Sequence, residues 1–172
     1  MGSSPSADVY YGYDLGDMTD HDTYDSLAPS WWEDSGDWED ELARRLGWEK
    51  VSFPDDYPEW DSLTSREDRI RIMDEYKASS VAYQAYAASR DRKVELLASI
   101  PVEIRWYGYR EESCYAIRAK ASVQRAFDWG SVPLKPLEVD PAWAGQIARF
   151  VELLELTVPE GGPAWHLNCS YG

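Results

Sequence analysis

The sequence predicts an α+β fold, a mostly antiparallel sheet of about four strands with three helices packed on one face. Three observations lead to this class. Apolar and polar residues alternate at both ends of the chain, which predicts two terminal strands that are neighbours in the sheet. Two further alternating segments, joined by a short polar link, predict a central β-hairpin. The intervening segments carry apolar residues three or four apart, the spacing of helices.

The first strand is expected over residues 8–16, DVYYGYDLG, where apolar or aromatic residues alternate with polar ones. The face expected to point inward holds Val9, Tyr11, Tyr13 and Leu15. The residues that follow, 17–30, are polar and contain a proline, so they predict a loop.

Two helices have clear end signals. For the first, over residues 36–46, Ser35 is the expected N-cap, and the acidic first turn and basic last turn complement the helix dipole. Gly47 stands where a C′ glycine ends a helix. For the last helix, Asp140 is the expected N-cap and Pro141 occupies the first helical position.

A long helix is expected between these two. Ser65 is its candidate N-cap, and the helical pattern continues to about Ala98. This span exceeds the usual length of globular helices, so a break is expected near Ser79–Ser80 or Ser89.

The remaining strands follow the long helix. Residues 102–110 and 114–123 form the expected hairpin, in which Arg118 and Lys120 point away from the core. Residues 127–139 predict a connection, and residues 163–172, PAWHLNCSYG, predict the last strand. Its inward residues are expected to be Trp165, Leu167, Cys169 and Tyr171, and its outward residues His166, Asn168 and Ser170.

Charge is concentrated at the beginning of the chain. Up to Asp68 there are 19 acidic and 4 basic residues, so this part carries the whole net charge of −15. Residues 14–61 are both acidic and rich in tryptophan, and we expect them to form a surface segment. An acidic protein disfavours nonspecific binding to nucleic acid or to an anionic membrane, and favours a basic partner.

Length and composition bound the remaining organisation. A chain of 172 residues predicts one domain over residues 1–172, with residues 1–7 as a flexible leader. Neither a signal peptide nor an apolar run of membrane-spanning length is recognisable, which predicts a cytoplasmic protein. Two cysteines do not make a disulfide-rich scaffold. No cofactor is expected.

Three short motifs resemble a family of small, mostly uncharacterised proteins encoded by actinobacteria and their phages. They are the opening YYGYDLG, the PSWW segment at Pro29–Trp32 and the closing WHLNCSYG. Family members end in a similar strand with a tryptophan before the last glycine, which this chain lacks. The resemblance implies a phage or actinobacterial setting and no particular activity.

The sequence offers little support for an enzymatic function. His21 lies in the acidic segment, and His166 is expected on the opposite strand face from Cys169, which disfavours a Cys–His pair. No catalytic residue is therefore assigned. The run that begins at Asp20 lacks the glycine and the oxygen spacing of an EF-hand calcium loop, so no metal site is assigned either. Walker, dinucleotide-binding and HExxH motifs are absent.

The acidic segment carries the functional hypothesis. A run of charges usually forms a solvated face, but aromatic residues interleaved with these acids are typical of interfaces. We expect a non-enzymatic acidic protein, a phage-encoded inhibitor of DNA-mimic type (anti-CRISPR or anti-nuclease), that binds a basic nucleic-acid-handling host or defence protein. The alternatives are an immunity protein against a basic toxin and a carboxylate–metal-dependent hydrolase. The expected contact residues are Trp31, Trp32, Asp34, Asp37, Glu39, Asp40, Glu41, Asp55, Asp56 and Glu59.

Overall fold

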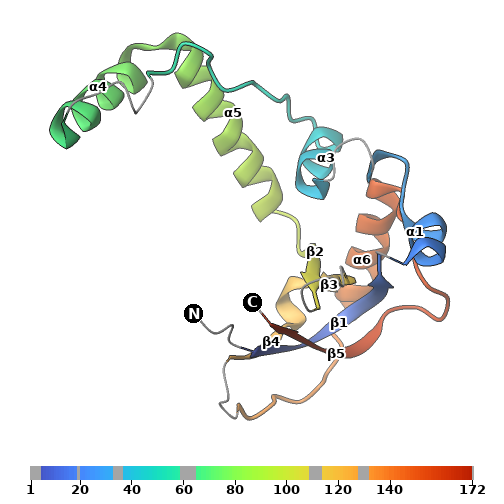
Figure 1. Cartoon of the computed structure of the whole chain (residues 1–172). Helices are drawn as coiled ribbons and strands as arrows, with labels where there is room; N and C mark the ends of the chain where they lie inside the picture. The colour runs from blue at the N-terminus through green and yellow to red at the C-terminus, as the bar shows by residue number, and fades with distance from the viewer. Residues whose placement is uncertain are drawn as a thin grey trace. The chain divides into compact units, whose positions relative to one another are not determined.

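The computed structural model describes residues 5–18, 20–32, 37–58, 65–108, 114–127 and 132–171. The chain divides into two compact units (Figure 1). Unit 1 comprises Met1–Leu42 and Ile100–Gly172, and unit 2 comprises Ala43–Ser99. The single domain expected over residues 1–172 stays a prediction, and each unit is described by itself.

Unit 1 is built on one antiparallel sheet, which confirms the α+β class. Its five strands are β1 (Pro5–Asp17), β2 (Val102–Tyr107), β3 (Cys114–Ala119), β4 (Gln124–Phe127) and β5 (Ala164–Tyr171). Strand β1 is central, with β5 along one edge and β3 followed by β4 along the other. The pairing of β1 with β5 confirms that the terminal strands are neighbours. The pairing of β2 with β3 confirms the hairpin.

The edge of β1 that pairs with β3 and β4 is interrupted. The strand expected over residues 114–123 ends at Ala119, and a short 3-10 helix, η2 (Lys120–Ser122), precedes β4. The buried Ser122 bridges the gap: its Oγ accepts a hydrogen bond from Tyr11 N at 2.9 Å and donates one to Ala119 O at 2.7 Å. The Ser122 side chain thus supplies the acceptor that the interrupted edge does not offer to Tyr11 N.

One face of the sheet is apolar and packs against helix α6 (Pro141–Leu154). Ile147, Phe150 and Leu154 of α6 are buried there. Trp143 of the same helix contacts Tyr11 of β1, with ring centroids 5.9 Å apart. The start of α6 is as expected, because Asp140 caps it through Ala142 N and Pro141 follows.

Burial along β5 differs from the expectation. Register places Leu167 opposite Val9, on the helix-covered face as expected. Leu167 is nevertheless 67% exposed and Cys169 is exposed, whereas Asn168 on the other face is buried. The reason is that α6 packs against β1, β2 and β3, while the opposite face of the sheet is concave and buries its own polar side chains.

The burial of Arg118 also differs from the expectation, for the same reason. It lies on the face opposite the core residue Ile117, as expected, but only 4% of it is exposed. Strands β2 and β5 contact each other although β3 and β1 separate them in the sheet, so the sheet curls around this polar face. Alternation predicts which face a side chain occupies but not whether that face is solvated.

Two short helices lie in the acidic part of the chain. Helix α1 (His21–Leu27) replaces the expected loop because Asp20 caps it, accepting a hydrogen bond from Thr23 N at 3.0 Å. Helix α3 (Trp38–Arg45) confirms the next expected helix, although Ser35 lies outside the described residues. Its N-cap is Asp37, whose Oδ1 accepts from Glu39 N at 2.9 Å.

The C-terminal end of α3 is as expected. Gly47 has a φ of +87°. Gly47 N donates to Arg44 O at 3.0 Å, and Trp48 N donates to Ala43 O at 2.9 Å. These two bonds form a Schellman motif, for which glycine is the favoured C′ residue.

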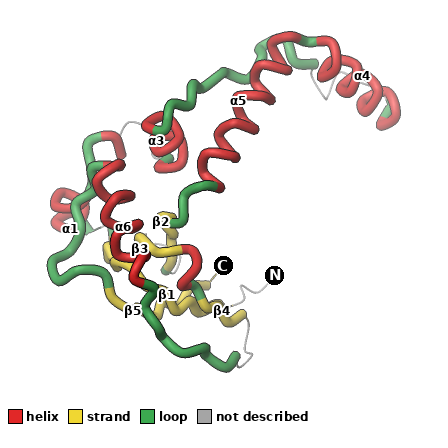
Figure 2. Tube along the Cα trace, turned by 180° about the vertical axis from the view of Figure 1, so that it is seen from behind, coloured by secondary structure: helices red, strands yellow, loops and turns green. Residues whose placement is uncertain are grey.

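Unit 2 contains α4 (Arg66–Ser79) and α5 (Val81–Ala98). The expected long helix is broken at Ser80, one of the two expected places, and Ser65 caps α4 as expected. Figure 2 shows the turn between the two helices. Beside them lies a cluster of aromatic rings with centroids 4.8–6.4 Å apart, formed by Phe53, Tyr57, Tyr76, Tyr83 and Tyr86.

Among the described residues, no helix has the length and apolar character needed to cross a membrane.

Candidate functional site

The structure divides the expected contact acids between the two units. Asp37, Glu39, Asp40 and Glu41 belong to unit 1, and Asp55 and Asp56 to unit 2. Asp34 and Glu59 lie outside the described residues.

These acids differ in their burial and in the hydrogen bonds that they make. Asp37 is the N-cap of α3, and Glu41 is buried with 6% of its surface exposed. Asp56 accepts a hydrogen bond from Tyr76 OH at 2.5 Å. Glu39 and Asp55 are exposed. Of the expected contact acids that the structure describes, Glu39 and Asp55 are therefore the best placed to meet a partner without loss of a local structural contact.

The two tryptophans expected as anchors lie against the core of unit 1. Trp31 is 8% exposed, and its Nε1 donates a hydrogen bond to Leu154 O, the last carbonyl of α6, at 2.8 Å. Trp32 is half-buried between Trp31 and Tyr115, with ring centroids 5.4 and 5.3 Å away. Trp31 is thus a core residue, and its burial makes it unsuitable as a surface anchor.

We expect Trp31→Phe to destabilise the protein by about 1–2 kcal/mol, because it leaves the buried Leu154 carbonyl without its donor and opens a small void. Trp32→Phe should lower the stability by less than half as much, since the Trp32 indole has no hydrogen bond to a described residue that the substitution would remove. Urea unfolding monitored by circular dichroism measures both. Equal stabilities of the two variants would contradict the core role of Trp31.

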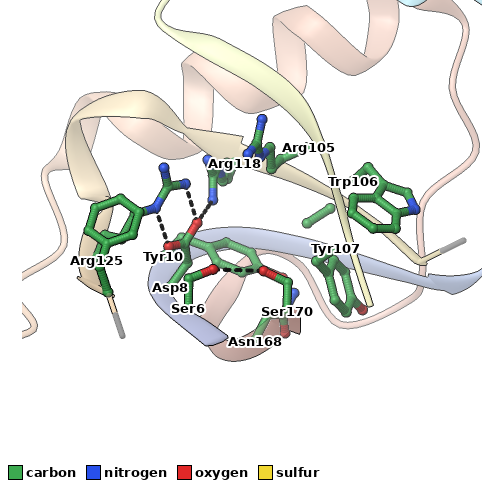
Figure 3. Close-up of a pocket in the computed structure, with 12 residues that line it drawn as sticks. Ser6, Asp8, Tyr10, Arg105, Trp106, Tyr107, Arg118, Arg125, Asn168 and Ser170 are labelled. Carbon is green, nitrogen blue, oxygen red and sulfur yellow. Dashed lines mark hydrogen bonds and ion pairs between the residues drawn. The ribbon is translucent and has the colours of Figure 1, made fainter. Parts of the chain in front are cut away.

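A second candidate site is the concave polar face of the sheet in unit 1 (Figure 3). It forms a small, open hollow. All five strands contribute to its lining: Ser6, Asp8 and Tyr10 from β1, Arg105 and Tyr107 from β2, Ala116 and Arg118 from β3, Arg125 and Phe127 from β4, and Asn168 and Ser170 from β5. Trp106 also lines it.

An ionic network forms one wall of this hollow. Asp8 accepts two hydrogen bonds from Arg125, both at 2.5 Å, and one from Arg118 at 2.6 Å. Arg118 also pairs with Glu103 at 2.8 Å. Both side chains of the Asp8–Arg118 pair are largely withdrawn from solvent, at 13% and 5% exposure. Removing Asp8 would leave the buried Arg118 with Glu103 as its only remaining partner in this network, and removing Arg118 would leave Asp8 with Arg125 alone.

The ionisation of the wall follows from these contacts. Burial raises the pKa of Asp8, but the hydrogen bonds and charges of Arg125 and Arg118 outweigh it and hold the pKa below its usual range. Burial and the nearby Asp14 carboxylate raise the pKa of the Tyr10 phenol well above its usual value. At neutral pH the hollow therefore holds an ionised Asp8 and a protonated Tyr10.

The floor of the hollow consists of neutral hydrogen-bonding groups. Asn168 Nδ2 donates to Tyr10 OH at 2.8 Å, and the hydroxyls of Ser6 and Ser170 are 2.8 Å apart. Beside the floor, Tyr107 OH donates to Asp14. These bonds hold side chains of three strands in place.

Sequence reasoning did not single out this site. Apart from Trp106, its members alternate along each strand, as Asp8 and Tyr10 do along β1, so the pattern resembles that of an ordinary solvated face. One signal was available: residues of opposite charge recur on the outward positions of neighbouring strands, with Asp8 and Glu103 matched by Arg118. Opposite charges on adjacent strands indicate pairing rather than solvation.

Metal-binding and nucleophilic groups are sparse in the described part of the chain. No three His, Cys, Asp or Glu side chains gather there in a way that could hold a metal ion. His166 stacks on Tyr10 and lies 3.2 Å from Gly12 O, and Cys114 and Cys169 do not form a disulfide.

Comparisons with protein-family models, with curated proteins and with solved structures found no match. The resemblance to the actinobacterial and phage family stays a prediction.

Proposed function

We propose that this chain is a non-enzymatic acidic interaction protein that binds a basic, nucleic-acid-handling protein. In a phage setting it would act in the bacterial cytoplasm as a DNA-mimic inhibitor of a host or defence protein such as a nuclease or CRISPR effector. The observation that carries the proposal is the charge distribution: residues up to Asp68 hold the entire net charge of −15.

The exposed acids of this part of the chain support the proposal. Helix α1 presents Asp22 and Asp25, and α3 presents Glu39, while unit 2 adds Asp55. Carboxylates held on helices keep their spacing, unlike those on a disordered tail. A concentrated negative potential of this kind accelerates encounter with a basic surface and makes the encounter sensitive to salt.

The test has two steps: capture of a partner from lysate, and a competition measurement with the purified partner. The tagged protein is incubated with actinobacterial lysate at about 50 mM and about 500 mM salt, which differ severalfold in screening length. We expect a basic nucleic-acid-binding protein at low salt that is depleted at high salt. The captured protein is then purified, and competition between this chain and a DNA duplex for it is measured. Loss of DNA binding supports mimicry.

Charge variants decide whether the expected acids make the contact. We expect Glu39→Lys and Asp55→Lys, tested singly and together, to weaken binding, by about tenfold or more for the pair. The matched control is Glu138→Lys with Glu160→Lys, which changes the net charge equally but alters exposed acids in the neutral part of the chain. Equal weakening by both pairs would mean that the expected acids do not form the contact. Capture of a toxin would instead favour the immunity protein.

A further inference from the structure

The concave face of the sheet has the composition of a ligand site rather than of a surface for a basic partner. Its lining has three cations, Arg105, Arg118 and Arg125, against Asp8, and Glu103 pairs with Arg118 from beside it. Asp14, which accepts a hydrogen bond from Tyr107 of the lining, is a third carboxylate beside the hollow. Three arginines are therefore balanced by three carboxylates, so the site is locally neutral within a chain whose net charge is −15 and differs in this from the acidic segment.

The hydrogen-bonding capacity left in the hollow consists mostly of donors. Tyr10 OH accepts from Asn168, so its own proton remains available to an acceptor. Ser6 and Ser170 share one hydrogen bond, which leaves a second hydroxyl proton. Arg105 is exposed at the rim and makes no ion pair with any described residue. Tyr10 is 1% exposed, so this donor is built into the fold.

The available acceptors are fewer. Both oxygens of Asp8 are occupied by Arg118 and Arg125. A buried donor left without an acceptor is unfavourable, so a ligand rich in acceptors is favoured over one rich in donors. Figure 3 shows Asp8 and Tyr10 between Arg105 and Arg118 on one side and Ser6, Ser170 and Asn168 on the other, so donors from several strands surround the hollow.

We propose that this hollow binds the oxyanion group, carboxylate or phosphate, of a small molecule. Arg105 supplies the charge, and Tyr10 with the Ser6–Ser170 pair supplies neutral donors. The space open to water-sized groups is about 70 Å³, which suits the oxyanion group of a ligand and not a whole drug-sized molecule. The exposed ring of Phe127 at the rim offers an apolar surface for the rest of an organic ligand. This site is independent of the acidic contact residues.

The test titrates the full chain, labelled with ¹⁵N, with sodium phosphate and separately with sodium benzoate. Ionic strength is held at about 0.15 M with sodium chloride so that screening does not change during the titration. We expect saturable shifts of amide signals confined to the strands that line the hollow. Saturation by phosphate identifies an inorganic or phosphate ligand, and saturation by benzoate identifies an organic carboxylate.

Variants separate the site from a general effect of charge. Arg105→Gln should weaken binding about tenfold, the value of one charged hydrogen bond. Ser170→Ala should weaken it severalfold. Arg90→Gln is the matched control, because it removes the same charge from an exposed arginine of α5 and should leave binding unchanged. Shifts that do not saturate with either anion, or equal effects of Arg105→Gln and Arg90→Gln, would overturn the proposal.

Discussion

Gly12→Ala is expected to unfold the protein or to destabilise it severely. Gly12 lies in the middle of β1 opposite Arg118, where a Cβ atom would stand 1.9 Å from Ile117 O and 2.9 Å from Arg118 Cα. Both are backbone atoms of β3, so the clash is relieved only by separating the two strands. We expect a loss of at least about 4 kcal/mol, a large part of the stability of a typical domain. Thermal and urea unfolding measure it.

Gly145→Ala is the matched control for this substitution. Gly145 is exposed within α6, and an added Cβ would meet nothing within 4 Å. Because alanine has the higher helix propensity, we expect a gain of about 0.5–1 kcal/mol. A Gly12→Ala variant as stable as the wild type would show that β1 and β3 do not approach as closely as the structure places them.

Asp8→Asn is expected to cost about 3 kcal/mol at neutral pH. The amide offers one acceptor oxygen in place of two, while Arg118 remains buried and Arg125 loses its paired hydrogen bonds. The control is Asp22→Asn on α1, an exposed acid whose replacement should change stability by less than about 0.5 kcal/mol. Urea unfolding at pH 7 compares the two.

The effect of Asp8→Asn should also depend on pH. The pKa of Asp8 is lower in the folded protein than the usual value near 4 in an unfolded chain. The ionised carboxylate therefore stabilises the fold above about pH 4, and this contribution is lost as pH falls through the folded pKa. The stability difference between wild type and Asp8→Asn should shrink below about pH 4. A difference independent of pH would contradict an ionic role.

Much of the secondary structure could be predicted because its signals are local. Ser65, Ser80 and Asp140 cap their helices through hydrogen bonds that span only two or three residues. Gly47 ends α3 for an equally local reason. The missed helix α1 also has a local signal, its cap Asp20, which was obscured by the many acids around it.

The candidate sites were predicted less well. Glu39 and Asp55 are exposed as the acidic segment suggests, but Trp31 contacts a carbonyl 123 residues further along the chain. The hollow was not predicted at all. Its Asp8–Arg125 pair joins residues 117 positions apart, and only strand pairing brings them together.

The sequence by itself determined the α+β class, the pairing of the terminal strands, most helix ends and the concentration of charge before Asp68. Tertiary structure alone decided which face of the sheet became solvated. Alternation places Asn168 and Arg118 on the polar face, yet the curl of the sheet brings β2 to β5 and buries them. The physical reason is that burial depends on the curvature of the sheet and on where α6 packs. Both depend on contacts between segments that are far apart in the sequence.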